Sequence, residues 1–226
     1  MGRLRYLSYE LENDTPCFGA NAPVQITVDV DFATGPYIQH LIETINHNGS
    51  HVDVPRHFCP EGRTLSDLPA DTWEFSRVLL VDLPVPDDHL ISPSDLAQVL
   101  SGHVIDDIDA LLIRTGFGRC RADDHDRYLR RNPGFGPQAA DWLLERCPAL
   151  RGLFCDIPSY AAWAHIPEGV AFHQHMLGQA YDDRFVLLFE DIMLPDDLEP
   201  VSELWAVPIR LRELDGAPVT VLARSQ

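Results

Sequence analysis

The sequence contains no lysine, and all 17 of its basic residues are arginine. Without a lysine amine the chain cannot form a Schiff base with a carbonyl substrate. Its 35 acidic residues give a formal net charge of −18, which argues against binding to nucleic acid or to anionic membranes, because both attract surfaces rich in Lys and Arg. We therefore expect a small-molecule substrate and neither a nucleic-acid nor a membrane partner.

Three further kinds of motif are missing. The five cysteines are odd in number and include no C-x-x-C pair, which argues against a disulfide framework and a cysteine zinc knuckle. No apolar run approaches the roughly 18 residues of a membrane span, and Met1–Glu10 has no apolar core of the signal-peptide type. There is also no G-x-S-x-G nucleophile elbow. The simplest expectation is a cytoplasmic enzyme with reduced thiols.

The length of 226 residues and a hydrophobic content of 45% suit one domain, residues 1–226, with a substantial core. Short β-rich runs alternate with helical segments, which predicts an α/β fold. Strands are predicted over Val24–Phe32, Tyr37–Asn46, Val78–Leu83, Ala110–Thr115, Gly152–Ile157, Phe185–Phe189, Trp205–Leu214 and Val219–Ala223. Helices are predicted from Ser94, as the cap, through Leu100, and over Gln138–Cys147.

The stretch from His47 to His57 carries the clearest chemical signal. Its four ligand-type residues, His47, His51, Asp53 and His57, occupy odd-numbered positions only. Side chains alternate between the two faces of an extended chain, so a strand would project all four to one side. A helix would also bring the first two histidines together, but the glycine and the proline inside the stretch disfavour it. Imidazole nitrogen and carboxylate oxygen without thiolate predict a catalytic Zn²⁺ or Mn²⁺ site.

The same stretch resembles the H-x-G-T-H-x-D-x-P-x-H signature of the metal-dependent cyclase-like hydrolases, the family that includes bacterial kynurenine formamidase and isatin hydrolase. Only Ser50, where the family usually has threonine, departs from it, and the hydroxyl is kept. Later segments are similar to the family as well. They are Leu111–Gly116, Asn132–Gly134 before an Ala-Ala-x-Trp-Leu helix, Gly152–Ser159, Trp205–Pro208 and Gly216–Val219.

The resemblance implies a swivelling β/β/α fold with a small barrel-like sheet, assembled as a homodimer or homotetramer. It also implies roles for the residues of the motif. His47, His51 and Asp53 would bind one metal ion, Asp53 could bridge to a second, and His57 would transfer protons. One or two ions of Zn²⁺ or Mn²⁺ per chain are therefore expected.

The resemblance places the rest of a two-metal site far downstream. The family has a histidine before a Leu-Leu-Gly-like segment and then a glutamate, and His173 and Glu190 match these positions best. His175 and Asp191 are the alternatives. The stretch from Gln179 to Arg184 is longer than the tight turn of the family, so it requires an insertion, which we expect to be a solvated loop.

The predicted reaction is hydrolysis of a small amide, formamide or lactam. A divalent metal lowers the pKa of its bound water to near 7, and His57 would carry a proton to the departing nitrogen. Kynurenine formamidases have an aromatic W-P-G-D-like element near the N-terminus, where this chain has Pro16-Cys17-Phe18-Gly19-Ala20. Phe18 is either a substrate-stacking residue or part of the core. Further aromatic candidates for the pocket are Trp73, Trp163 and Phe172.

Two other functions stay open. The same metal could act as a Lewis acid in a cyclase or dehydratase of secondary metabolism. Alternatively, the chain could be a non-catalytic metal- or ligand-binding protein of the same fold. The presence of His57 favours an enzyme, because a binding protein needs no proton-transfer group at that position.

Overall fold

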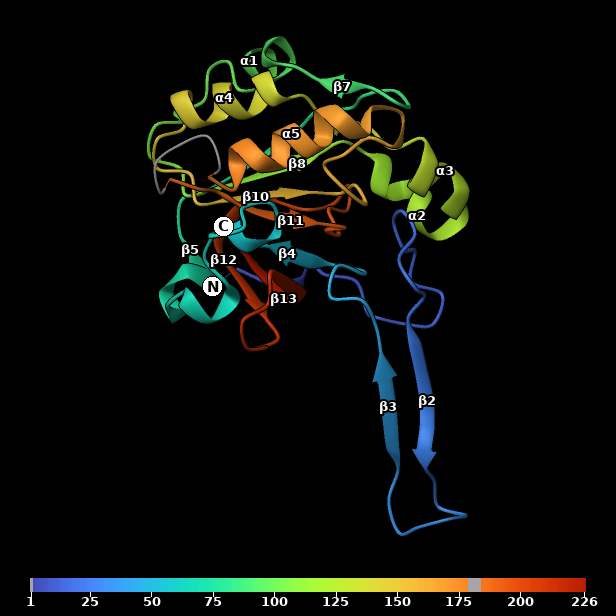
Figure 1. Ribbon diagram of the computed structural model, residues 1–226. Coiled ribbons are helices and arrows are strands. Elements are labelled where there is room, and N and C mark those ends of the chain that lie inside the picture. Colours follow the sequence, from blue (N-terminus) through green and yellow to red (C-terminus); the bar gives the residue numbers. More distant parts are fainter. Residues whose placement is uncertain (1, 179–183) are drawn as a thin grey trace.

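The computed structural model describes residues 2–178 and 184–226. It has a mixed α/β body from which a two-stranded ribbon projects (Figure 1). The strands are β1 Leu4–Tyr6, β2 Gln25–Val30, β3 Gln39–Glu43, β4 His51–Asp53, β5 Glu74–Phe75, β6 Val78–Asp82, β7 Leu90–Ile91, β8 Ala110–Arg114, β9 Gly134–Phe135, β10 Gly152–Cys155, β11 Leu187–Glu190, β12 Val201–Pro208 and β13 Gly216–Ser225. The α-helices are α1 Pro93–Val99, α2 Cys120–Asp123, α3 His125–Arg130, α4 Pro137–Arg146 and α5 Ile166–Met176. Short 3₁₀ helices are η1 Pro55–His57, η2 Leu65–Asp67, η3 Ala70–Trp73, η4 Phe117–Arg119 and η5 Trp163–His165.

One large sheet organises the body. Its strands follow the order β5-β12-β13-β4-β11-β10-β8-β6, and β1 pairs with β13. The neighbours β6, β8, β10 and β11 run parallel, whereas β4 is antiparallel to both β11 and β13. Because β12 also contacts β6, the sheet curves towards a closed, barrel-like form. The predicted α/β class and barrel-like sheet are confirmed.

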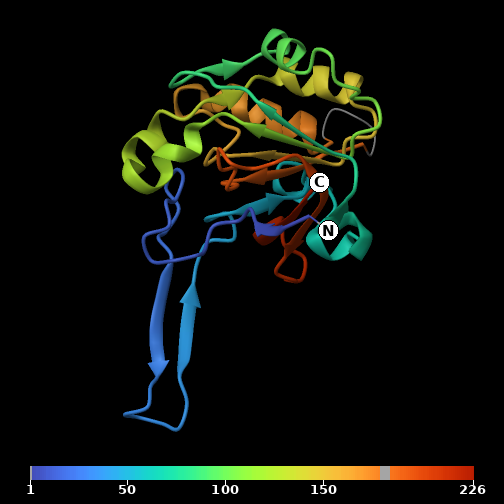
Figure 2. The same ribbon diagram turned by 180° about the vertical axis from the view of Figure 1, so that it is seen from behind.

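Helices cover one face of the parallel strands, as both ribbon views show (Figures 1 and 2). Strand β8 is a run of apolar residues that is buried almost throughout, which is typical of a parallel strand covered on both faces. On its helix side Leu111 and Ile113 join the core beneath α4 and α5. On the other side Leu112 joins a second core inside the curved sheet, where Phe154 and Phe189 stack with ring centroids 4.0 Å apart.

Most predicted elements are present with shifted ends. The strands predicted near residues 78, 110, 152, 185, 205 and 219 correspond to β6, β8, β10, β11, β12 and β13, and the helix predicted over Gln138–Cys147 is α4. The predicted cap Ser94 is wrong. Ser92 caps α1, because Pro93 occupies the first helical turn and the Ser92 hydroxyl accepts a hydrogen bond from the Asp95 amide. Helix α5 was not predicted.

The extended conformation predicted for the whole of residues 47–57 is also wrong. Only His51–Asp53 forms a strand, β4. His47 lies in a turn in which Gly49 has a φ of 68°, a left-handed conformation that glycine adopts without strain. His57 ends η1, which begins at Pro55, where a fixed φ suits the first helical position. Chain reversals before and after β4, rather than strand alternation, therefore position the outer two histidines.

No helix among the residues that the structure describes is long and apolar enough to cross a membrane.

Candidate metal centre

Strand β4 carries the centre of the site between its two antiparallel neighbours. His51 lies opposite Glu190 of β11, and Asp53 lies opposite Gly216 of β13. His173, on the last turns of α5, approaches the same cluster. The fold thus brings His173 and Glu190 next to the motif, although they lie more than a hundred positions further along the sequence. This proximity is what the predicted two-metal site requires.

The buried half of the site consists of Asp53, His173 and Glu190, whose ligand-type atoms lie within 4.8 Å of one another. Nε2 of His173 is 3.0 Å from Glu190 Oε1 and 3.7 Å from Asp53 Oδ2. Glu190 Oε1 also accepts a hydrogen bond from the Tyr160 amide at 2.8 Å. These contacts fix the orientation of the Glu190 carboxylate towards the cluster.

Two histidines aim their Nε2 atoms at these carboxylates. Nδ1 of His51 donates to the Gly49 carbonyl at 2.8 Å, and Nδ1 of His173 donates to the Gly169 carbonyl at 2.6 Å. In the neutral tautomer each Nε2 then carries a lone pair. Nε2 of His51 is buried without a hydrogen-bond partner, 3.2 Å from Glu190 Oε2. Lone pairs facing carboxylate oxygens suit a bound cation.

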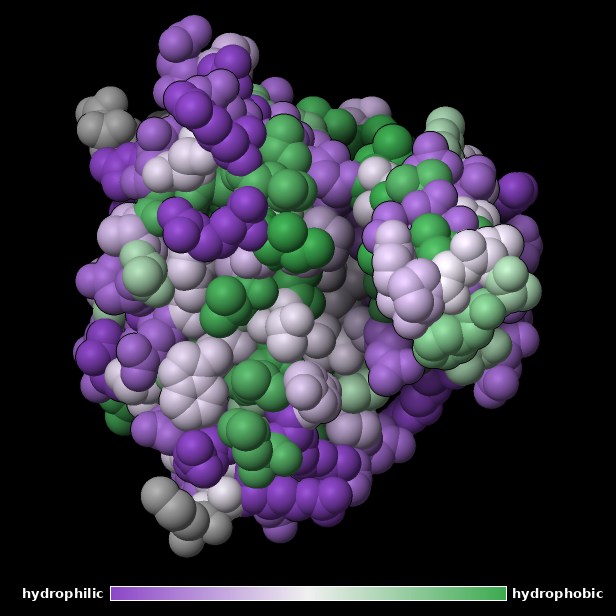
Figure 3. All heavy atoms as spheres, turned by 90° about the horizontal axis from the view of Figure 1, so that it is seen from below, coloured by the Kyte–Doolittle hydropathy of each residue, from purple (hydrophilic) through white to green (hydrophobic). Residues whose placement is uncertain are grey.

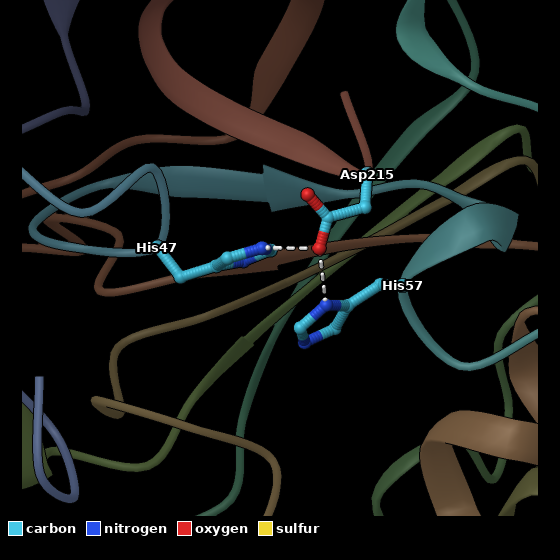
Figure 4. A group of neighbouring side chains, drawn as sticks. All are labelled: His47, His57 and Asp215. Carbon is cyan, nitrogen blue, oxygen red and sulfur yellow. Dashed lines mark hydrogen bonds and ion pairs between the residues drawn. The ribbon is translucent and has the colours of Figure 1, made fainter. Parts of the chain in front are cut away.

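The other half of the site is partly exposed and consists of His47, His57 and Asp215 (Figure 4). A single carboxylate oxygen, Oδ2 of Asp215, lies 2.9 Å from His47 Nε2 and 2.8 Å from His57 Nδ1. The two imidazoles stack with ring centroids 4.0 Å apart. His47 Nδ1 in turn lies 2.8 Å from Asp53 Oδ1, which links this half to the buried one. Because Asp53 is 1% exposed and His57 27%, the cluster is open to solvent on the His57 side.

Asp215 was missed by sequence reasoning, although it directly precedes a segment that resembles the family, Gly216–Val219. It is held by Asn46, whose side-chain amide donates to Asp215 Oδ1 at 2.9 Å. Gly216 is required beside it, because a Cβ there would lie 2.5 Å from His47 Cε1 and 2.6 Å from the Val52 carbonyl oxygen. The signal available in the sequence was an acidic residue directly before the glycine that begins the family-like segment Gly216–Val219.

Carboxylates control the protonation of the exposed half. Burial alone would lower the pKa of His47, but hydrogen bonds with Asp215 and Asp53 override it and raise that pKa to about 10. The same contacts act in reverse on Asp215, where hydrogen bonds from His47 and then His57 hold the carboxyl pKa well below its usual range.

The buried half shows the same balance. Burial alone would raise the pKa of Glu190, but His173 and His51 hold it below its usual value. Burial would likewise lower the pKa of each of these histidines, and the Glu190 carboxylate raises it instead. In the absence of a cation, protons on the imidazoles therefore compensate the buried carboxylates.

The alternative ligands lie elsewhere. His175 is on the far side of the last turn of α5, with Nδ1 2.8 Å from Asp141 Oδ1. Asp191 accepts two hydrogen bonds from the buried Arg121 guanidinium, at 2.6 and 2.8 Å, and one from Tyr128. The geometry thus brings His173 and Glu190 together with the motif. Of the insertion expected at Gln179–Arg184, residues 179–183 lie outside the described part of the chain.

The aromatic candidates separate into different environments. The ring of Phe18 meets that of Trp163 edge-on, with centroids 5.9 Å apart, and both are at least partly exposed. The Phe18 segment is tied to the motif, because Asn48 donates to the Ala22 carbonyl at 2.9 Å. Phe172 is fully buried in the core, which excludes it as a pocket candidate. Trp73 lines a different groove, between the η2–η3 segment and the end of β12.

Comparison with known proteins agrees with this geometry. A family model described as "Putative cyclase" matches residues 6–162, well over half of the chain. The chain belongs to this cyclase family. The resemblance inferred from the stretch between His47 and His57 is thereby confirmed.

Two relatives of this chain in sequence are distant ones. The kynurenine formamidase of Bacillus cereus is 24% identical over 182 residues, which cover 79% of this chain and 76% of that protein. An uncharacterised protein of Haemophilus influenzae is 25% identical over 118 residues, or 52% of this chain and 82% of that one.

Solved structures share the fold. Isatin hydrolase A from Labrenzia aggregata, bound to benzyl benzoate, superposes with a TM-score of 0.79 at 23% identity, covering 99% of this chain and 93% of that one. A second isatin hydrolase, bound to the product analogue thioisatinate, gives 0.82 at 18% identity, with 97% and 91% covered. At these identities the comparison establishes the architecture and not the substrate.

Protonated His47 makes metal binding depend on pH. Its pKa of about 10 keeps it charged at pH 7 in the metal-free protein, whereas a metal ligand must be neutral. We expect Zn²⁺ uptake between pH 7 and 9 to release protons, and the affinity to rise with pH towards 10. Calorimetry in buffers of different ionisation enthalpy measures the release. His47→Gln should lower it and the exposed His103→Gln should not; equal release from both variants would contradict the assignment.

Proposed function

We propose that this chain is a metal-dependent hydrolase that cleaves a small amide, formamide or lactam. The observation that carries the proposal is the pair of buried imidazole nitrogens, Nε2 of His51 and of His173, aimed at the carboxylates of Asp53 and Glu190. A cluster of this composition is suited to a divalent cation and is expensive to bury for structural reasons alone.

The residues that would hold metal form two overlapping groups. His47, His51 and Asp53 would hold one ion, and Asp53, His173 and Glu190 would hold a second. Asp53 belongs to both groups and would be shared. Nitrogen and oxygen donors without thiolate favour Zn²⁺ or Mn²⁺, with one or two ions per chain.

Such a cation, when bound, lowers the pKa of coordinated water towards neutrality and polarises a carbonyl oxygen. The protein supplies the remaining groups. Nδ1 of His57 donates to Asp215, which fixes the tautomer and leaves Nε2 to exchange protons. That Nε2 lies 4.0 Å from Asp53 Oδ2, beside the metal ligands. His57 is therefore placed to protonate the departing nitrogen of an amide.

We propose an aromatic or aryl-linked substrate. Phe18 and Trp163 form an edge-on pair beside the segment that carries His47, and their exposed rings offer an apolar face for stacking. The names of two kinds of relative, kynurenine formamidase and isatin hydrolase, point to carbon–nitrogen bonds next to an aromatic ring. A cyclase or dehydratase using the same cation as a Lewis acid is the second candidate, favoured by the description of the family.

The direct test is a substrate screen with Zn²⁺- and Mn²⁺-loaded protein. Formylated aromatic amines, isatin-like lactams and simple aryl esters are assayed by product release, with chelator-treated protein as the control. Hydrolysis that disappears on chelation and returns with metal is expected. Metal-dependent conversion with no incorporation of oxygen from labelled water would instead favour the cyclase or dehydratase.

Glu190→Gln should lower both the metal content and the rate, because the amide cannot supply the charge that the cluster requires. Elemental analysis of untagged protein measures the content. Asp191→Asn is the matched control: it should retain the metal while destabilising the fold by about 3–5 kcal/mol, because it breaks the buried pair with Arg121. Loss of metal in the Asp191 variant alone would reverse the two roles.

His57→Ala should keep most of the metal and lose about 10²–10⁴-fold in turnover, the usual range for a general acid or base. Asp53→Ala should lose both, because Asp53 belongs to both ligand groups. Turnover and bound metal are measured on the same samples. If the two variants lose metal equally, His57 is a ligand and its proton-transfer role is wrong.

Asp215→Asn should slow turnover mainly through His57, because the amide no longer fixes the His57 tautomer. In the double variant with His57→Ala, the Asp215 substitution should then cost little more than His57→Ala alone. A full multiplicative loss in the double variant would show that Asp215 acts separately, through its second contact with His47.

A further inference from the structure

Ser50, the residue at which the motif departs from the family signature, is a buried polar side chain next to the metal centre. It is 5% exposed, inside a body whose underside shows hydrophobic side chains across its middle (Figure 3). Because solvent hardly reaches its hydroxyl, that group needs hydrogen-bond partners within the protein. One of the partners it finds is the direct neighbour of a candidate metal ligand.

The Ser50 hydroxyl links β4 to the end of β11, where the backbone makes no link. Backbone groups along an antiparallel strand point alternately to its two neighbours. The Ser50 carbonyl accepts a hydrogen bond from the Val219 amide of β13 at 2.9 Å, so the backbone of Ser50 faces β13. On the side of β11, the Ser50 hydroxyl donates to the Asp191 carbonyl at 2.5 Å. Ser50 therefore holds β4 to both neighbours, to one by its backbone and to the other by its side chain.

The same hydroxyl fixes the N-terminal segment. The Tyr9 amide donates to Ser50 Oγ at 2.9 Å, so the hydroxyl is donor and acceptor at once. The Tyr9 ring lies against the Arg121 guanidinium, whose Cζ is 3.8 Å from the ring centroid. Arg121 in turn donates two hydrogen bonds to the Asp191 carboxylate. Tyr9, Ser50, Asp191 and Arg121 thus form a closed ring of contacts, in which each residue restrains the others.

Two candidate ligands lie directly beside this ring of contacts. His51 follows Ser50 in the sequence, and Glu190 precedes Asp191. The two are paired across β4 and β11, with His51 Nε2 3.2 Å from Glu190 Oε2. Gly49, on the other side of Ser50, accepts the hydrogen bond from His51 Nδ1 that fixes the ring. A shift of the backbone at Ser50 would therefore move both the His51 ring and its support.

We infer that Ser50 is a positioning residue of the metal centre, whose hydroxyl sets the spacing between His51 and Glu190. The inference rests on the proposed function, which assigns this cluster to a divalent cation. Ser50 itself touches neither cation nor substrate in this role. Ligand distances in a metal site are defined to within about 0.2 Å, so a small separation of the two strands weakens binding and changes the coordination geometry.

Two side chains of similar size isolate the effect of the hydroxyl. Ser50→Thr keeps the hydroxyl, whereas Ser50→Val replaces it with a methyl group. Each variant is loaded with Co²⁺, whose visible absorption spectrum reports the coordination geometry, and competition with a chelator measures the affinity. Ser50→Thr should match the unmodified chain. Ser50→Val and Ser50→Ala should bind Co²⁺ about tenfold more weakly, with an altered spectrum.

Ser225→Ala is the matched control for the loss of a buried serine hydroxyl. Ser225 is 8% exposed, and its hydroxyl accepts a hydrogen bond from the Arg3 amide at 3.0 Å. It lies at the end of β13 remote from Gly216, which pairs with Asp53. Ser225→Ala should lower the thermal stability of the metal-free protein about as much as Ser50→Ala, but leave the Co²⁺ affinity and spectrum unchanged. A merely structural role for Ser50 predicts the same unchanged spectrum for both variants.

Two results would overturn the inference alone. They are a Ser50→Val variant that keeps the affinity and spectrum of the unmodified chain, and a Ser225→Ala variant that loses as much affinity as Ser50→Ala. If the variants without a hydroxyl do not fold, Ser50→Cys takes their place, because a thiol is a weaker donor. It should bind Co²⁺ more weakly than Ser50→Thr, and equal binding would contradict the role of the hydroxyl.

Failure of the proposed function gives a different result. In that case the unmodified chain binds no divalent cation, and the inference about Ser50 falls with it. If the unmodified chain binds Co²⁺ and all four Ser50 variants bind it equally well, the metal centre stands and only the positioning role is wrong.

Discussion

The burial of two carboxylates side by side is the constraint on which the rest of the site depends. Asp53 and Glu190 are almost completely inaccessible to solvent and belong to adjacent strands. Removing each charge from water costs several kcal/mol unless positive charge and hydrogen bonds replace the solvent. The imidazoles and the Tyr160 amide supply that replacement, and a divalent cation would supply more of it.

The strand order explains why these particular residues meet. Placing β4 between β11 and β13 gives its side chains antiparallel partners on both sides, and α5 closes the face on which His51 and Asp53 project. Small residues permit the close approach: Gly216 leaves room for the His47 ring. The outer residues, His57 and Asp215, remain partly exposed, whereas Asp53 and Glu190 at the centre are buried. In the proposed reaction, proton exchange with a substrate would take place at this edge and charge balance at the centre, so the two tasks would be divided between the two halves of the site.

Sequence reasoning recovered the chemistry better than the local structure. The residue types and spacing in the motif predicted a convergent metal site, yet the assumed mechanism of convergence, an unbroken strand, was wrong. Gly49 and Pro55, which disfavour a helix, also bound the short strand on either side. Turns bring the ligand-type side chains to one place, as side-chain alternation along a strand would have done. A metal site constrains the positions of the ligand atoms and leaves the backbone conformation free. Asp215 could not be found from periodicity, since its partners lie about 160 positions away.

The surface of this chain balances its acidic residues differently from the metal centre. A chain with 35 acidic residues and no lysine has few cations to neutralise its surface, and its described arginines are mostly engaged by aspartates, as in the pairs of Arg114 with Asp82 and Arg127 with Asp87. At the metal centre the buried carboxylates of Asp53 and Glu190 are paired with imidazoles instead. An imidazole can give up its proton and keep its nitrogen as a ligand, which a guanidinium cannot, so a divalent cation could take over the charge balance there.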